Sequence, residues 1–224
     1  MGLATAAGER TESRARYGLL LVTLIAAYLV SAVTQTRWGG AIHVAFVTAI
    51  ALMAVRHTRP WPRSAWLAAG GVLAAAIAAG VCASSTSKPA IGAADIWNAL
   101  VLLAAVVIII GRVLRLDEVT VQSIYGAVST YLLIGLMFAA WFGAVAAFVS
   151  GPFFANGQAA NDETVQYFSF TTLTTLGYGD FTAAGSLGRA VAVLEAIAGQ
   201  VFLATLVARL VSAYGTTRRR PPPG

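Results

Sequence analysis

The chain has 224 residues, of which 58% are hydrophobic and only 11% are charged, with a formal net charge of +6. This composition excludes an ordinary soluble domain and indicates a protein whose solvent is the lipid bilayer. Cys82 is the single cysteine, which excludes an intrachain disulfide framework, and no Cys/His group has the spacing of metal ligands.

Six apolar windows qualify as membrane spans, since crossing about 30 Å of hydrocarbon takes roughly 20 mostly apolar residues. They predict an all-α integral membrane protein with six transmembrane helices. The second window is short and its ends are the least defined. In chain order the windows run from Gly18 to Thr34, Gly40 to Val55, Ser64 to Ala83, Ala93 to Gly111, Ile124 to Val149 and Leu187 to Ala213.

The arginines between these windows predict the topology. Cytoplasmic loops carry an excess of Lys and Arg, and assigning most arginines to the cytoplasm leaves only Arg37, Lys88 and Arg189 outside. Both termini are then cytoplasmic and the number of crossings is even. Because these arginines are divided among short loops, no continuous basic face for nucleic acid is expected. The cytoplasmic set is Arg10, Arg14, Arg16, Arg56, Arg59, Arg63, Arg112, Arg115, Arg218, Arg219 and Arg220.

The first window has two interpretations. Arg14 and Arg16, the apolar run and the small residues around Ser31 also fit a cleavable signal peptide. A permanent signal anchor preceded by a cytoplasmic tail, residues 1–17, is the favoured interpretation. The later windows keep the same orientation in both cases.

Residues 18–115 are predicted to form a four-helix membrane domain that is rich in Ala and nearly free of polar residues. Small residues such as Gly70 and Gly71 permit close helix contact. The stretch from Ala99 to Ile110 in its fourth window carries no charge. The composition changes at about Leu116, where a short polar stretch precedes the fifth window.

A short helix is predicted after the fifth window. Asn161 or Asp162 serves as its N-cap, and acidic residues in the first turn suit the positive end of the helix dipole. The helix lasts about three turns before Gly177, too few to span, so it is predicted to enter the bilayer and turn back. Irregular backbone at membrane depth must be buried by protein or line a water-filled route, which indicates a pore.

The residues that follow suit a dehydrated cation. To replace water around K⁺, consecutive backbone carbonyls must turn toward one axis. Such a conformation needs positive φ, which Gly177 and Gly179 adopt at little steric cost. Thr175 adds a hydroxyl at the inner end, Tyr178 is expected to brace the loop against the short helix, and Asp180 to lie at the outer mouth.

The segment Thr175-Leu176-Gly177-Tyr178-Gly179-Asp180 resembles the potassium-channel filter signature Thr-Val-Gly-Tyr-Gly-Asp. The resemblance extends from Ile124 to Tyr214. It implies that residues 116–214 are a pore domain of outer helix, pore helix, selectivity-filter loop and inner helix. It also implies a homotetramer that conducts K⁺ passively, is not an enzyme, needs no cofactor and binds the permeant ion through the filter backbone.

Two departures from the family pattern change what the resemblance implies. Leu176 replaces valine, which is expected to alter filter stability more than ion preference. Behind the filter, Thr171 stands where some bacterial relatives have glutamate, and Tyr167 and Phe168 stand where many voltage-gated relatives have tryptophan. Tyr167 is the expected substitute partner for Asp180. A nonselective or sodium-preferring pore of the same architecture is the closest alternative.

Six spans with the pore in the last two resemble voltage-gated channels, whose sensor has arginines at every third position. Each charge crossing the field contributes about 2.3 kcal/mol per 100 mV. Because the stretch from Ala99 to Ile110 is uncharged, and Arg112 and Arg115 lie at the cytoplasmic end of the window, residues 18–115 resemble a voltage-sensor domain without gating arginines. Weak voltage dependence is therefore expected.

The last window carries three candidate features. Gly199 is either a hinge or a site of close helix packing, with equal support for each. Glu195, regarded as the one carboxylate inside any span, is assigned a structural role ahead of a gating role, with Thr172 or another pore-helix hydroxyl as its partner. A hydrophobic gate able to close by dewetting is predicted from Leu203, Leu206, Val207, Leu210 and Val211.

Residues 215–224 form a basic cytoplasmic tail too short to fold. Its arginines anchor the topology, and contact with anionic lipid headgroups, worth about 1 kcal/mol per charge, is the alternative. Many Ala and Arg with one Lys indicate a GC-rich bacterium, so a multi-pass protein of the bacterial inner (plasma) membrane is expected. An enzyme lacks support because His43 and His57 have no catalytic partners nearby, and a transporter because no paired repeats are evident.

Overall fold

The computed structural model describes residues 18, 21–25, 75–82, 85–114 and 121–217, and the side chains of most of these. Residues 21–25 and 75–82 are helical. The second predicted span, most of the first and third, and most of both tails lie outside the described residues. Of the arginines assigned to the cytoplasm, Arg112 lies in the last turn of a described helix and the others lie outside the described residues. The architecture below is therefore that of the last four helices, α4 to α7.

Helix α4 runs from Lys88 to Leu114. It begins five residues before the predicted start at Ala93, because the Ser87 carbonyl accepts the Ile91 amide at 3.1 Å and Pro89 fits the first turn, where no amide is needed. Asp95, which already falls in the predicted window from Ala93 to Gly111, lies within this apolar helix, so the expectation that Glu195 is the only carboxylate in a span is wrong.

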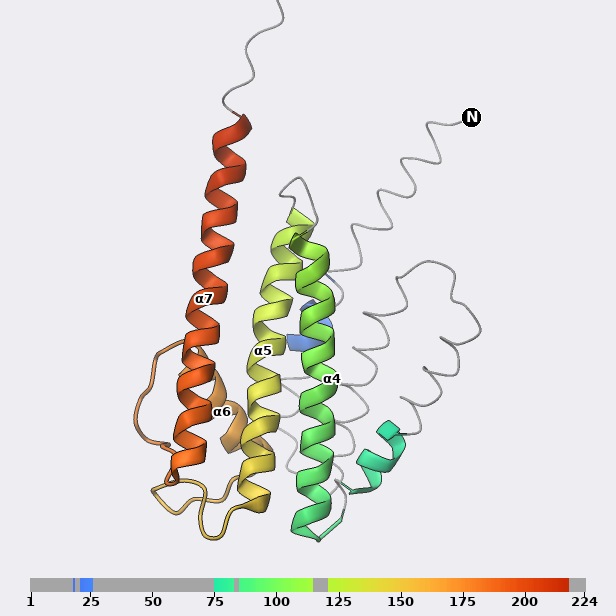
Figure 1. Ribbon diagram of the computed structural model, residues 1–224, viewed down its shortest axis with the longest axis vertical. Helices are drawn as coiled ribbons and strands as arrows, with labels where there is room; N and C mark the ends of the chain where they lie inside the picture. The colour runs from blue at the N-terminus through green and yellow to red at the C-terminus, as the bar shows by residue number, and fades with distance from the viewer. Residues whose placement is uncertain (1–17, 19–20, 26–74, 83–84, 115–120, 218–224) are drawn as a thin grey trace, which may run out of the picture.

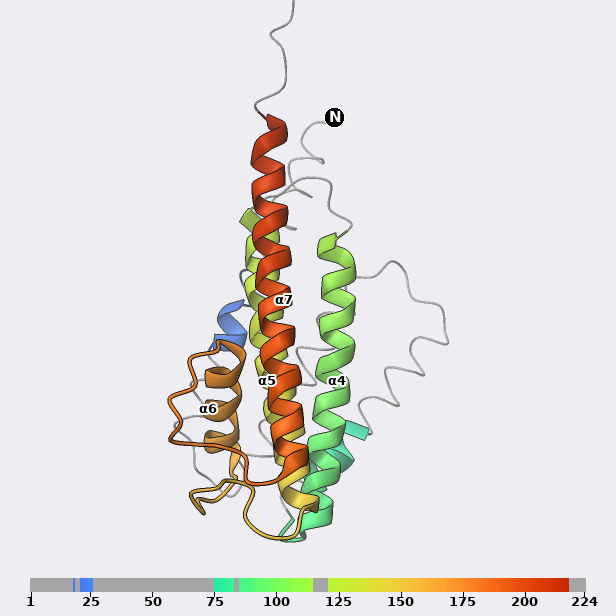
Figure 2. The same ribbon diagram turned by 60° about the vertical axis from the view of Figure 1, so that its left-hand side comes forward.

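Helix α5, Val121–Phe148, packs along α4, and both views show the two side by side (Figures 1 and 2). A Cβ on Gly92 would meet Phe148 at 2.7 Å, and one on Gly143 would meet the Asp95 carboxylate at 2.7 Å. The residue numbers of the contacting partners therefore fall along α5 as they rise along α4, so the two helices are antiparallel. Two glycines allow this approach, and the second makes room for a carboxylate.

Helix α6, Asp162–Leu173, is a 12-residue helix beside one end of α5 and α7. Its length matches the predicted three turns. Helix α7, Ser186–Thr217, runs without interruption through Gly199. The predicted fifth and sixth spans agree with α5 and α7 to within four residues at each end.

Two apolar clusters position α6. The first joins α4, α5, the end of α6 and the helical segment 21–25. Its buried members are Leu24, Leu102, Val106, Ile109, Leu133, Ile134, Leu136, Met137 and Leu173. The second is aromatic and joins α5, α6 and the loops on either side of α6, with Phe142 and Phe168 ring centroids 4.8 Å apart. Its buried members are Ala139, Phe142, Phe153, Phe154, Val165, Phe168 and Ala183.

The loops before and after α6 pair with each other. The Ala155 amide donates to the Thr182 carbonyl and the Ala184 amide to the Phe153 carbonyl, both at 2.8 Å, around an antiparallel bridge between Phe154 and Ala183. This pairing joins the loop ahead of α6 to the start of α7. Both ends of the α6 segment are thereby held at the same end of the helices, as Figure 1 shows.

Three described helices are long and apolar enough to cross a membrane. The segments are Lys88–Gly111, Ser123–Phe148 and Ser186–Ser212, with mean hydropathies of 2.4, 2.0 and 2.0. Only 11% of the best window in the last segment is buried within the chain, against 44% and 50% in the others. Helix α7 therefore presents most of its apolar surface to something outside the described part of this chain.

Candidate ion pathway

The start of α6 is fixed by a capping box. Asn161 is the N-cap, and its side-chain oxygen accepts the Thr164 amide at 2.9 Å, while Thr164 Oγ1 accepts the Asn161 amide at 2.9 Å. Asp162 and Glu163 fill the first turn, where the helix dipole favours negative charge. Of the two predicted caps, Asn161 is therefore the correct one.

The loop after α6 has left-handed backbone at every second residue. The φ angles are +57° at Thr175, +51° at Gly177 and +82° at Gly179, while Leu176 and Tyr178 keep negative φ. Alternation between left- and right-handed backbone turns successive carbonyls to one side of the chain. The glycines tolerate this conformation, whereas at Thr175, which the sequence analysis did not identify as strained, it costs on the order of 1–3 kcal/mol.

Contacts with α6 help to hold this loop. The amides of Leu176 and Gly177 both donate to the Thr171 carbonyl, at 2.9 and 3.1 Å, and the Thr175 amide donates to the Thr172 carbonyl at 2.9 Å. The loop amides are thus turned back toward the end of the helix. The side chains of Leu176 and Tyr178 are 54% and 68% exposed, so within one chain neither is packed.

The outer end of the loop is tied to two separate elements. Tyr167 Oη on α6 donates to Asp180 Oδ2 at 2.8 Å, and Asn156 Nδ2 donates to the Asp180 carbonyl at 2.7 Å. The hydrogen bond to Asp180, followed by desolvation and the nearby negative charge, raises the pKa of the Tyr167 phenol above its ordinary value. The structure thus brings together Tyr167 and Asp180, and it adds Asn156.

Asn156 was missed by the sequence analysis. Its side-chain oxygen also accepts the Gln158 amide at 3.0 Å, an Asx-type turn that the Asn-Gly pair at 156 and 157 could have signalled. Gly157, the second residue of this turn, has a φ of +75°, which glycine adopts at little steric cost.

The inner end of the loop is contacted by α5 and α7. Tyr131 Oη donates to the Leu173 carbonyl at 3.2 Å, and Gln200 Nε2 donates to Thr175 Oγ1 at 3.4 Å. A Cβ on Gly199 would clash with the Leu173 carbonyl oxygen, so only glycine fits there without movement. The close-packing interpretation of Gly199 therefore has a specific contact, and the hinge stays a prediction. Sequence reasoning missed Tyr131 and Gln200.

Glu195 on α7 is fully buried against α6. Its Oε1 accepts a 2.5 Å hydrogen bond from Ser169 Oγ, which also lies 2.7 Å from the Gly135 carbonyl oxygen of α5. Among the described residues, Glu195 Oε2 has no hydrogen-bond partner. The α6 hydroxyl that contacts Glu195 is thus that of Ser169, the other hydroxyl that the prediction allowed beside Thr172.

The predicted gate residues divide between two sides of α7. Leu203, Val207 and Val211 follow one another at intervals of four residues and are exposed. Leu206 and Leu210 are partly buried, and Leu206 lines an apolar cavity of about 400 Å³ between α4, α5 and α7. A single chain therefore presents three of the five residues as one exposed apolar stripe.

Comparison with known proteins gives one match. No curated protein matches the chain. Residues 136–215, from the second half of α5 to the end of α7, match the family model described as an ion channel. Together with three helices that are long and apolar enough to cross a membrane, this match supports an ion-channel domain in a membrane protein.

Proposed function

We propose that the chain is one subunit of a potassium-selective channel in which four copies bring their 175–180 loops around one axis. The observation that carries this proposal is the left-handed backbone at Thr175, Gly177 and Gly179, which turns successive carbonyls to the same side. A ring of such carbonyls replaces the hydration shell of K⁺. The match of residues 136–215 to ion channels supports the same assignment.

Four copies also account for surface that one chain leaves uncovered. Helix α7 buries little of its apolar length, and Leu176 and Tyr178 of the loop are exposed. In the proposed homotetramer, α7 and the 175–180 loop of each copy contact the neighbouring copies. The α5–α4 side of each subunit then faces lipid or the first three spans, and anionic headgroups meet the basic tail.

Gating by voltage is proposed to be weak. Between Lys88 and Gly111, α4 contains no arginine, and its internal charge is the carboxylate of Asp95. An arginine ladder is what converts membrane potential into opening, so this helix lacks the means to do so. A steep conductance–voltage relation would contradict the proposal.

The deciding measurement is the reversal potential of the purified full chain in planar bilayers, with K⁺ on one side and Na⁺ on the other. We expect the potential to follow K⁺, barium to block the current, and Gly177→Ala to abolish it. Gly151→Ala is the matched control, because Gly151 also has a positive φ, +102°, but lies outside the loop and outside the Asn156 turn that contacts it. Equal permeation of Na⁺ and K⁺ by a folded tetramer would favour the nonselective alternative.

A further inference from the structure

A pocket of about 500 Å³ lies between α4, α5, the first turns of α6 and the loop that precedes α6. Its walls are mostly apolar, from residues such as Ile91, Ala140, Phe153 and Val165. This volume is in the range of small-molecule sites, which combine apolar walls with a few polar groups. The pocket is separate from the 175–180 loop, none of whose residues lines it.

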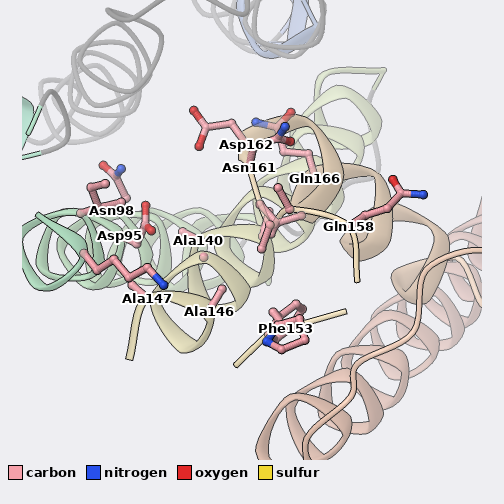
Figure 3. A pocket seen from close by; sticks show the side chains of 18 of the residues that line it. Asp95, Asn98, Ala140, Ala146, Ala147, Phe153, Gln158, Asn161, Asp162 and Gln166 are labelled. Carbon is pink, nitrogen blue, oxygen red and sulfur yellow. The ribbon is translucent and has the colours of Figure 1, made fainter. Parts of the chain in front are cut away.

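The acceptor groups of this pocket come from two helices. Asp95 and Asn98 are one turn apart on α4, and Asp162 faces them from α6 (Figure 3). Both carboxyl groups and the Asn98 amide line the same pocket, which Lys88 also lines. Acceptor oxygens from two carboxyl groups and an amide favour an occupant that brings N–H donors, and ionised carboxylates favour one that carries positive charge.

Asn98 gives independent evidence for an occupant. Its side chain is only 4% exposed, it lines the pocket, and its Oδ1 has no hydrogen-bond partner in the part of the chain that the structure describes. A buried amide oxygen without a partner costs about 1–3 kcal/mol, so an N–H donor entering the pocket would relieve this cost.

We propose that this pocket binds a small organic cation carrying a primary ammonium group on a short apolar body. An ammonium can donate three hydrogen bonds, and the side-chain oxygens of Asp95, Asn98 and Asp162 can accept them. The apolar walls of the pocket would cover the rest of the molecule. A bare divalent ion is less suited because Ca²⁺ takes six to eight oxygens, and the described residues hold no cluster of three or more acidic, His or Cys ligands.

The test is ligand-observed NMR on the purified full chain, with butylammonium as the probe. We expect saturable binding with a dissociation constant on the order of 1 mM, as suits so few atoms. Asp95→Asn and Asn98→Leu should each weaken binding at least about tenfold. Glu163→Gln is the matched control, since Glu163 is an exposed neighbour of Asp162 that does not line the pocket.

Two other probe molecules test whether the charge and the N–H donors of butylammonium are needed for binding. One further variant tests the shape of the pocket without removing an acceptor. 1-Butanol and butyltrimethylammonium should bind several-fold more weakly, because one lacks the charge and the other lacks N–H donors. Gly143→Ala keeps every acceptor but places a methyl group where the Asp95 carboxylate lies, and should also weaken binding.

The proposal is overturned by any of three results. One is equal binding of butylammonium and 1-butanol, which would make the pocket merely apolar. Another is unchanged affinity in folded Asp95→Asn. The third is binding that appears only in Lys88→Met, which would mean that the ammonium of Lys88, which lines the pocket, already occupies it. Because the readout is binding, failure of the channel assignment would not affect the result.

Discussion

At the scale of the residue, Tyr167 joins α6 to the outer end of the loop through its hydrogen bond to Asp180. Because the pKa of the phenol is raised, the folded chain holds this proton more tightly than the unfolded chain does, where the ordinary value is 10.0. The stabilisation is therefore complete below pH 10 and is lost as the pH rises through the higher value of the folded state.

Tyr167→Phe removes this hydrogen bond and keeps the ring that packs against Phe181 at a centroid distance of 5.5 Å. We expect the melting temperature at pH 7 to fall by about 2 °C, and the difference from the wild type to shrink above pH 10. Thermal unfolding of both proteins between pH 7 and pH 11 measures this. A difference that stays constant over this range would show that the phenol proton is not responsible.

At the scale of the element, α6 is wedged between α5 and α7 with a defined register. On the α7 side, Ser169 contacts Glu195 and Leu173 lies against Gly199, four residues further along both helices. The two helices therefore run in the same direction at this contact. On the α5 side, Ser169 contacts Gly135 whereas Leu173 contacts Tyr131, so those helices run in opposite directions.

This register makes Gly199 the position where α7 tolerates least change. Gly199→Ala would force its methyl group against the Leu173 carbonyl, and we expect a loss of about 1–3 kcal/mol in stability. Gly111→Ala is the control, because a Cβ there meets nothing within 4 Å, and should stabilise the helix by about 0.5–1 kcal/mol. Thermal unfolding of the solubilised protein compares them. Wild-type stability in Gly199→Ala, with altered opening, would favour the hinge.

The same register explains what the sequence could and could not predict. Hydropathy was sufficient to predict the lengths of α5 and α7. The capping residues were sufficient to predict where α6 begins. The choice between Ser169 and Thr172 depends on how α6 is rotated, which distant contacts at Gly135 and Gly199 determine. Asp95 was overlooked because spans are recognised by their lack of charged residues. The space for its carboxylate is created by Gly143 on another helix, α5, which the local sequence around Asp95 does not reveal.

At the scale of the whole molecule, α7 is the least buried of the three described helices that are long and apolar enough to cross a membrane. The exposed stripe of Leu203, Val207 and Val211 begins on α7 just after Gln200, which contacts Thr175 of the loop. In the proposed tetramer, four such stripes converge below the filter. Narrow apolar constrictions exclude water, so this stripe is where closure by dewetting would take place.

Val207→Ser tests this arrangement, since a hydroxyl on the stripe lets water remain in the constriction. We expect single-channel open probability to rise at least about threefold, with unchanged preference for K⁺ over Na⁺ because the 175–180 loop is untouched. Leu206→Ser, one residue earlier but in the lining of the apolar cavity between α4, α5 and α7, should lower thermal stability without raising open probability. The opposite result, opening by Leu206→Ser alone, would place the other side of α7 on the ion path and require each helix to be rotated in the tetramer.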